Sequence, residues 1–246
     1  DYMKILFISL GCDKNLADSE EMLGLLTGSG HEIVDSEEDA DAIVINTCCF
    51  IHDAKEESVN TILEMAEYKK TGKCKALIVT GCMAQRYKEE ITQEIPEVDA
   101  VLGTTSYGDI VKALNEAQAG HVFQEFRDIN ELPEDSGRRV LTTGGHFGYL
   151  KIAEGCDKHC TYCIIPSLRG KFRSVPEERL LAQAEYMASQ GVKELILVAQ
   201  ETTVYGTDLY GKKTLHILLK KLCQIKGIRW IRVLYCYPEE IYDELI

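Results

Sequence analysis

Three cysteines in one short stretch carry the clearest chemical signal of the sequence. They are Cys156, Cys160 and Cys163, and they follow one another as Cys-x3-Cys-x2-Cys. Three thiolates can hold three irons of a [4Fe–4S] cluster, which leaves the fourth iron open to bind another molecule. The spacing therefore predicts an iron–sulfur site with one open coordination position.

Other uses of these thiols fit the sequence less well. A zinc site usually pairs its thiols and is completed by a fourth ligand, but no fourth Cys or His follows Cys163 at a comparable spacing. His159 lies inside the run, yet it adjoins Cys160 and would compete for the same face of the metal. Three buried structural cysteines are disfavoured because Lys158 and Arg169 indicate a polar loop.

A second set of three cysteines is spread over the first half of the chain. Cys12, Cys48 and Cys82 each follow a run predicted to be a buried strand. The carboxyl ends of parallel strands lie along one edge of a sheet, where ligands normally bind, and Gly11 and Gly81 permit sharp turns close to a bound group. Any one of these thiols alone could be a small buried filler. Three at equivalent positions predict a shared metal site.

The elements that position the cysteines follow from the hydrophobic pattern. Buried parallel strands are predicted at 4–10, 42–45, 76–79 and 100–102. Helices are predicted at 19–26, 54–68, 84–95 and 109–119, each closed by a glycine or a proline. This alternation predicts an α/β fold, with a doubly wound parallel-sheet domain over residues 1–126.

Residues 127–145 are rich in charge, glycine and turn formers and are predicted to be an interdomain linker. In the segment 146–246 strands are expected at 149–153, 194–199 and 230–234, and helices at 176–190 and 215–225. Pro176 and the two acidic residues after it suit a helix N-terminus. The second domain is thus predicted to be the first half of a TIM-type barrel, with the cysteine loop at the top of its first strand.

Composition limits the remaining possibilities. A chain of 246 residues with 45% hydrophobic content can form packed cores, and it contains no apolar run of about 18 residues for a membrane span. The ten cysteines are not arranged as in a small secreted disulfide domain, which indicates a reducing cytoplasm. The net charge of −13 disfavours a broad nucleic-acid-binding surface and leaves room for a basic protein as partner. A monomer is expected.

The two cysteine sets together resemble the radical S-adenosylmethionine (SAM) methylthiotransferases. Within that family, Gly11-Cys12-Asp13-Lys14-Asn15 resembles the branch that modifies ribosomal protein uS12, whereas tRNA-modifying members usually read Gly-Cys-Gln-Met-Asn. Further segments of the chain resemble the same branch: 46–48, 81–87, 149–156, 164–166, 169–170 and 197–206. Glu201 stands in the last of them, where an aspartate is more common.

The resemblance implies a radical SAM enzyme with two [4Fe–4S] clusters. The cluster on Cys156, Cys160 and Cys163 would cleave SAM to a 5′-deoxyadenosyl radical, which removes hydrogen from the β-carbon of an aspartate in uS12. An auxiliary cluster on Cys12, Cys48 and Cys82 would bind external sulfur, and a second SAM would give the methyl group. An electron donor protein and a sulfur source are implied as partners.

The resemblance also suggests four SAM contacts, and it assigns no catalytic acid or base. Tyr162 is expected near the adenine, although a packing aromatic explains it nearly as well. Gln200 and Glu201 are expected at the SAM ammonium, with a solvated strand end as the alternative. Arg169 is expected to pair with the SAM carboxylate or with a surface acid.

Two other functions remain open at this point. One is tRNA methylthiolation by the same chemistry, and the other is a non-catalytic iron–sulfur carrier. Family members continue with about three more β/α units and a TRAM domain. The chain is accordingly expected to be a fragment with an incomplete barrel. The other cysteines are expected to be structural, as is a histidine in the last predicted helix: Cys49, Cys74, Cys223, Cys236 and His216.

Overall fold

The computed structural model describes residues 2–246, which form two compact units, one up to Val140 and one from Leu141 to Ile246. The division falls inside the segment 127–145. The first part of that segment packs on the first unit, because the Arg127 amide donates to Ser106 Oγ at 2.9 Å. Arg139 also forms a buried ion pair with Glu20, with Nη2 and Oε2 2.6 Å apart.

The first unit is built on a six-stranded sheet in the order β2-β1-β3-β4-β5-β6. Every neighbouring pair is parallel. The strands are β1 Lys4–Ser9, β2 Glu32–Val34, β3 Ala42–Thr47, β4 Ala76–Gly81, β5 Ala100–Leu102 and β6 Phe123–Glu125. All residues of β3 and β4 are buried, as is typical of parallel strands that are covered on both faces.

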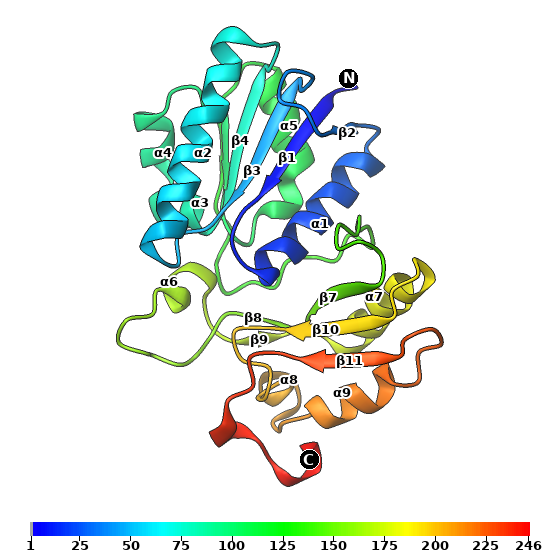
Figure 1. Ribbon diagram of the computed structural model, residues 1–246. Coiled ribbons are helices and arrows are strands. Elements are labelled where there is room, and N and C mark those ends of the chain that lie inside the picture. The colour runs from blue at the N-terminus through cyan, green and yellow to red at the C-terminus, as the bar shows by residue number, and fades with distance from the viewer. Residues whose placement is uncertain (1) are drawn as a thin grey trace. The chain divides into compact units, whose positions relative to one another are not determined.

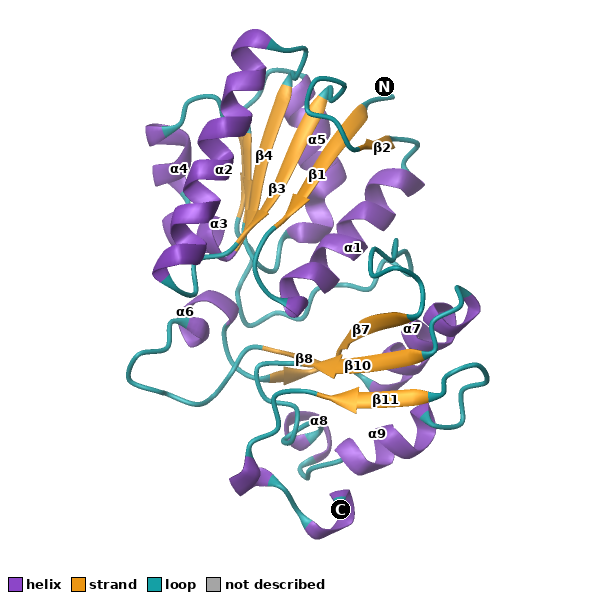
Figure 2. Ribbon diagram, in the orientation of Figure 1, coloured by secondary structure: helices purple, strands orange, loops and turns teal. Residues whose placement is uncertain are grey.

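Helices cover both faces of this sheet (Figures 1 and 2). On one face lie α1 and α5, whose Met22, Leu26, Ile110 and Leu114 pack in the main core with the strands. On the other face lie α2, α3 and α4. The helices are α1 Asp13–Gly28, α2 His52–Thr71, α3 Cys82–Tyr87, α4 Glu89–Glu94 and α5 Ile110–Gln118, with a 3-10 turn at Tyr107–Asp109. The predicted doubly wound α/β class is confirmed.

The second unit contains a parallel sheet in the order β11-β10-β7. Its strands are β7 Phe147–Lys151, β10 Glu194–Val198 and β11 Trp230–Val233, and they alternate with α7 Glu177–Ser189 and α9 Leu215–Leu222. Shorter elements complete it: β8 Ala153–Glu154, α6 Ile165–Arg169, β9 Arg173–Ser174, α8 Thr207–Tyr210 and 3-10 turns at Pro238–Glu240 and Asp243–Leu245. The β/α alternation is the one expected for the start of a TIM-type barrel.

The structure differs from the sequence expectations in several elements, among them two edge strands and one helix. β2 and β6 were not expected, because each has three residues and lacks a continuous apolar run. The single helix expected over 84–95 is wrong, since Lys88 has φ of 43° and separates α3 from α4. A positive φ is uncommon outside glycine, so this break could not be predicted from the residue type. The single strand expected over 149–153 is also wrong, since β7 ends at Lys151 and β8 belongs to a separate sheet with β9.

None of the helices described within residues 2–246 is both long and apolar enough to cross a membrane.

Candidate functional site

The three cysteines of the first unit lie where the strand order reverses. From β1 the chain first forms β2 on one side and then crosses to β3 on the other, so the carboxyl ends of β1 and β3 flank a topological switch point. Such a point is where open α/β sheets usually bind ligands. Cys12 directly precedes α1 after β1, Cys48 follows β3, and Cys82 begins α3 after β4. The sheet thus gives three neighbouring strand ends one thiol each.

Buried polar side chains hold these strand ends together. The Asn15 amide donates to Leu10 O at 2.7 Å and to Thr47 O at 3.2 Å, which ties the loop after β1 to the end of β3. Thr47 Oγ1 donates to Thr80 O at 2.6 Å and ties β3 to β4. The Cys48 amide donates to Ser58 Oγ on α2 at 3.0 Å.

Asn46 completes this scaffold from the interior. Its amide donates to Asn15 O and to Ser19 Oγ, both at 2.9 Å, and its Oδ1 is buried without a hydrogen-bond partner among the described residues. The sequence did not predict a structural role for Asn15, Asn46 or Ser58. Asn15 and Asn46 do stand in segments that carry the family resemblance, but nothing in the sequence marks Ser58.

Two glycines let the loops approach one another. Gly11 has φ of +88°, and a Cβ built on it would lie 2.6 Å from Cys48 Cβ and 3.0 Å from Cys48 Sγ. Gly81 has φ of +92°, and its Cβ would lie 2.3 Å from Asn46 Oδ1 and 2.5 Å from Thr47 O. The loop before Cys12 therefore contacts Cys48 directly, and only glycine fits at either position.

We predict that Gly81→Ala destabilises the first unit far more than a glycine change without the close contact. Gly120 is the matched control, because it has φ of +80° but nothing within 4 Å of its added Cβ. Gly120→Ala should cost about 1 kcal/mol from backbone strain alone. Gly81→Ala should cost roughly 3 kcal/mol or more, since overpacking against a strand backbone adds to the strain. Urea unfolding of both variants measures the difference, and equal losses would contradict the close approach.

Cys49 lies beside this set, although it was expected to be only structural. It is 1% exposed, and burial raises its pKa to about 11, with Cys82 adding to the rise and Arg86 opposing it. A thiol with so high a pKa stays protonated near neutral pH. The structure therefore agrees with a structural role for Cys49, as it does for the buried Cys74. Cys223 and Cys236 instead lie at the surface.

In the second unit the other three cysteines lie in the loop between β8 and α6. All three are partly exposed, and this loop is fixed at its base by the Cys156 amide, which donates to Gly170 O at 3.0 Å. Burial raises the pKa of the Cys156 thiol, the Lys158 amide opposes the rise, and Glu201, Cys163 and Cys160 add to it. Binding to a metal would overcome this rise in the pKa of Cys156, because a coordinated thiol loses its proton to the solvent.

Arg169 is buried at the base of the same loop. It is 3% exposed, and its Nη1 lies 3.6 Å from Oε2 of the equally buried Glu154. Burial acts to raise the pKa of Glu154, but Lys151 and Arg169 hold it at about 2. Glu154, one acid that Arg169 faces, thus lies in the interior of the unit and not at its surface.

The other suggested SAM contacts differ in their surroundings. Tyr162 is 88% exposed, so it is not a packing aromatic in this structure. Gln200 and Glu201 follow β10, and Gln200 is half-buried. Glu201 is only 4% exposed, and its Oε1 is buried without a hydrogen-bond partner among the described residues. This excludes a solvated strand end for Glu201 and makes it a buried acceptor at the carboxyl end of a barrel strand.

The donor set of both cysteine groups suits iron–sulfur chemistry, since thiolate is the ligand that such clusters prefer. Among residues 2–246 no three His, Cys, Asp or Glu side chains converge closely enough to hold a single metal ion. A cluster of four irons is a larger group than one ion, so its thiol ligands need not converge as closely. The support for a cluster at each site is the type of the three ligands and their position in the fold.

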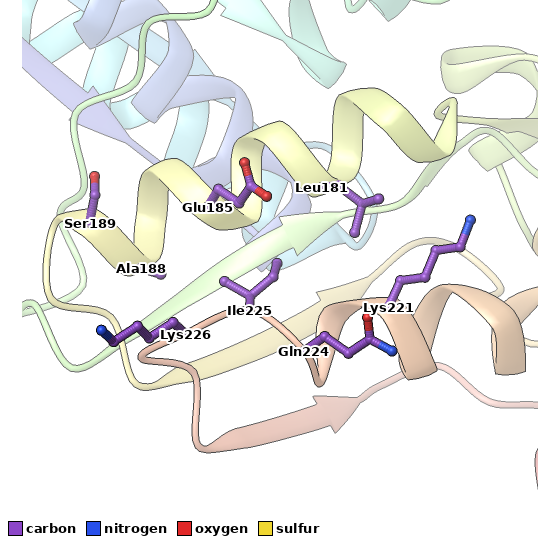
Figure 3. Close-up of a pocket in the computed structure, with 8 residues that line it drawn as sticks. All are labelled: Leu181, Glu185, Ala188, Ser189, Lys221, Gln224, Ile225 and Lys226. Carbon is purple, nitrogen blue, oxygen red and sulfur yellow. The ribbon is translucent and has the colours of Figure 1, made fainter.

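The remaining candidates lie away from the cysteines. An open groove between α7 and α9 is lined by Leu181, Glu185, Ala188, Ser189, Lys221, Gln224, Ile225 and Lys226 (Figure 3). It contains no thiol and lies on the helical side of the sheet, so it does not serve the cysteine chemistry. His216 Nδ1 is 3.0 Å from the Tyr242 hydroxyl, which agrees with a structural histidine.

Comparison with known proteins matches each unit to a family. Residues 4–103 match the uncharacterized protein family UPF0004, and residues 150–246 match the radical SAM superfamily. A solved structure of the radical SAM methyltransferase TsrM from Kitasatospora setae has a TM-score of 0.63 at 11% identity, covering 98% of this chain and 57% of that one. This similarity supports the fold. The second unit is thus a radical SAM domain.

Similarity over the whole chain is more specific. The ribosomal protein uS12 methylthiotransferase RimO of Lachnoclostridium phytofermentans is 66% identical over 99% of this chain and 56% of the relative. The protein of the same name from Clostridium botulinum (strain Eklund 17B / Type B) is 54% identical over 99% of this chain and 54% of the relative. Over nearly its whole length the chain is thus similar to proteins named RimO, and its second unit matches the radical SAM superfamily. It spans about half the length of the curated relatives it matches.

Proposed function

We propose that the protein containing this chain is a radical SAM methylthiotransferase that adds a methylthio group to the β-carbon of an aspartate in ribosomal protein uS12. The observation that carries the proposal is the identity of 66% to a protein of that name over 99% of the chain. The site agrees with it, because Cys12, Cys48 and Cys82 follow the carboxyl ends of three parallel strands and the other three cysteines share the one loop between β8 and α6. No feature of the site favours tRNA as substrate or a non-catalytic iron–sulfur carrier.

Six thiols would hold two [4Fe–4S] clusters, with Cys156, Cys160 and Cys163 on one and Cys12, Cys48 and Cys82 on the other. When bound, the clusters and SAM supply radical cleavage of a C–H bond and a place for external sulfur. We assign residues 1–126 to the auxiliary-cluster domain, 127–145 to the linker and 146–246 to the SAM domain.

Four side chains of the second unit are our candidates for holding SAM. Glu201 offers a buried carboxylate oxygen to the ammonium group, and burial raises its pKa while Lys158 opposes the rise. Gln200 lies beside it, and the exposed Tyr162 is available to stack on the adenine ring. Arg169 would pair with the SAM carboxylate, although its ion pair with Glu154 must then be shared.

The substrate is tested by offering two substrates side by side. The full-length protein, reconstituted without oxygen, is incubated with SAM, reductant, sulfide and either uS12 or tRNA, and both are examined by mass spectrometry. We expect methylthiolation of uS12 aspartate and none of the tRNA nucleosides. The charge of −13 on this part of the protein favours this result, because it repels a polyanion over roughly the 8 Å Debye length and attracts a basic protein. Methylthio groups on tRNA alone would overturn the assignment.

A further inference from the structure

Lys158 lies between the first two cysteines of the loop and points its ammonium group into an acidic cluster. Nζ is 3.7 Å from Glu201 Oε2, 3.8 Å from Glu239 Oε1 and 3.3 Å from Glu240 Oε1. The same atom lies 4.3 Å from the centre of the Tyr237 ring. One side chain of the cysteine loop thus contacts groups from two other segments.

Those segments are the ends of the two following strands. Glu201 comes shortly after β10, whereas Tyr237, Glu239 and Glu240 come after β11. Lys213 extends the network, because its Nζ donates to Glu240 O at 2.7 Å and to Glu240 Oε2 at 2.9 Å. The carboxyl ends of β10 and β11 are therefore joined to the cysteine loop through a single ammonium group.

The start of the loop is fixed by hydrogen bonds that do not involve the Lys158 ammonium group. Asp157 Oδ1 accepts from the Phe172 amide at 3.0 Å, and the Lys158 amide donates to Cys156 Sγ at 3.4 Å. These bonds hold the start of the loop near β9. The contacts of the Lys158 ammonium group instead hold the loop toward the ends of β10 and β11.

The burial of each acidic partner decides which ion pair of Lys158 contributes most to stability. The Glu239 side chain is 63% exposed, so its ion pair contributes little. The Glu201 side chain is 5% exposed and has one oxygen without a hydrogen-bond partner among the described residues. Removing the cation that faces a buried carboxylate costs much more than removing a surface partner.

We propose that Lys158 is a positioning residue that sets the shape of the cysteine loop by tying it to the ends of β10 and β11. It holds Cys156 and Cys160 in place before any metal binds, and it balances the charge of Glu201. This inference uses the proposed function only in taking the loop thiols as cluster ligands. The geometry of the metal-free loop can be tested whether or not that function is correct.

The test is hydrogen–deuterium exchange of the metal-free whole chain, followed by mass spectrometry of the peptides that cover 156–163. Lys158→Met keeps the length of the side chain and removes the charge. We expect exchange in this loop to become roughly fivefold faster, since the loop then opens locally more often. Lys158→Arg should restore most of the protection. Lys226→Met, which removes an exposed lysine from the α7–α9 groove (Figure 3), should leave the loop unchanged.

A second measurement separates this role from general destabilisation. Combining Glu201→Gln with Lys158→Met should lower the free energy of unfolding by less than the sum of the losses that the two single changes cause. The reason is that the double variant leaves no unpaired buried charge. After reconstitution, Lys158→Met should also lose iron to a chelator faster than the parent does. Unchanged exchange in Lys158→Met, or strictly additive effects of the two changes, would overturn the proposal.

Discussion

Replacing Cys156, Cys160 and Cys163 together with alanine is expected to remove about half of the iron bound after anaerobic reconstitution and all reductive cleavage of SAM. The reason is that the three thiols lie in one loop of the second unit, whereas the other set lies at strand ends of the first unit. Each cluster would then be ligated within its own unit. Iron is measured by a colorimetric assay and SAM cleavage by chromatography of 5′-deoxyadenosine.

The matched control replaces two cysteines outside both sets, namely Cys74 and Cys223. Cys74 is buried and Cys223 is exposed, and neither lies at the strand ends that carry the two sets. This variant should keep its iron and its SAM cleavage. Loss of all iron when only the second-unit loop is changed would refute independent sites.

The second large effect is expected from replacing Cys12, Cys48 and Cys82 with alanine. SAM cleavage should persist, because the loop of Cys156, Cys160 and Cys163 is unchanged, but methylthiolation should be abolished for lack of a sulfur site. The assay follows 5′-deoxyadenosine and the mass of the uS12 product in the same reaction mixture. A full yield of methylthiolated product from this variant would show that the first-unit cysteines have another role.

The structural integrity of this variant needs its own measurement. Cys48 and Cys82 are each 7% exposed, and Gly11 packs against Cys48, so small cavities will form. Urea unfolding shows whether the first unit still folds. If it unfolds, single replacements of the exposed Cys12 test the same claim without a change in packing.

The strands and helices that could be predicted are those with strong patterns. The runs that became β3 and β4 are continuous and apolar, and the helix expected over 176–190 is observed as α7 Glu177–Ser189. β2 and β6 pair with only one neighbour each and are partly exposed, so no hydrophobic run marked them. The break at Lys88 depends on a backbone conformation that this residue type seldom adopts.

Of the candidate site, only the cysteines that would bind the clusters could be predicted from the sequence. Cysteine spacing and position after strands suggested both ligand sets, because these depend on local sequence and on parallel topology. The burial of Arg169 and its pairing with Glu154 could not be seen, because the two residues meet only through folding. Lys158 and Glu201 lie 43 positions apart in the sequence, and neither residue type indicates the contact.

The central claim is that the loop of Cys156, Cys160 and Cys163 holds a cluster whose open iron binds SAM. The most direct test is the electron paramagnetic resonance spectrum of the reduced, reconstituted protein, recorded with and without SAM. The Cys12, Cys48 and Cys82 triple alanine variant leaves only the second-unit signal to be observed. We predict that SAM changes this signal, because it becomes a ligand of the open iron. A reduced cluster whose spectrum is the same with and without saturating SAM would contradict the account and favour an iron–sulfur carrier.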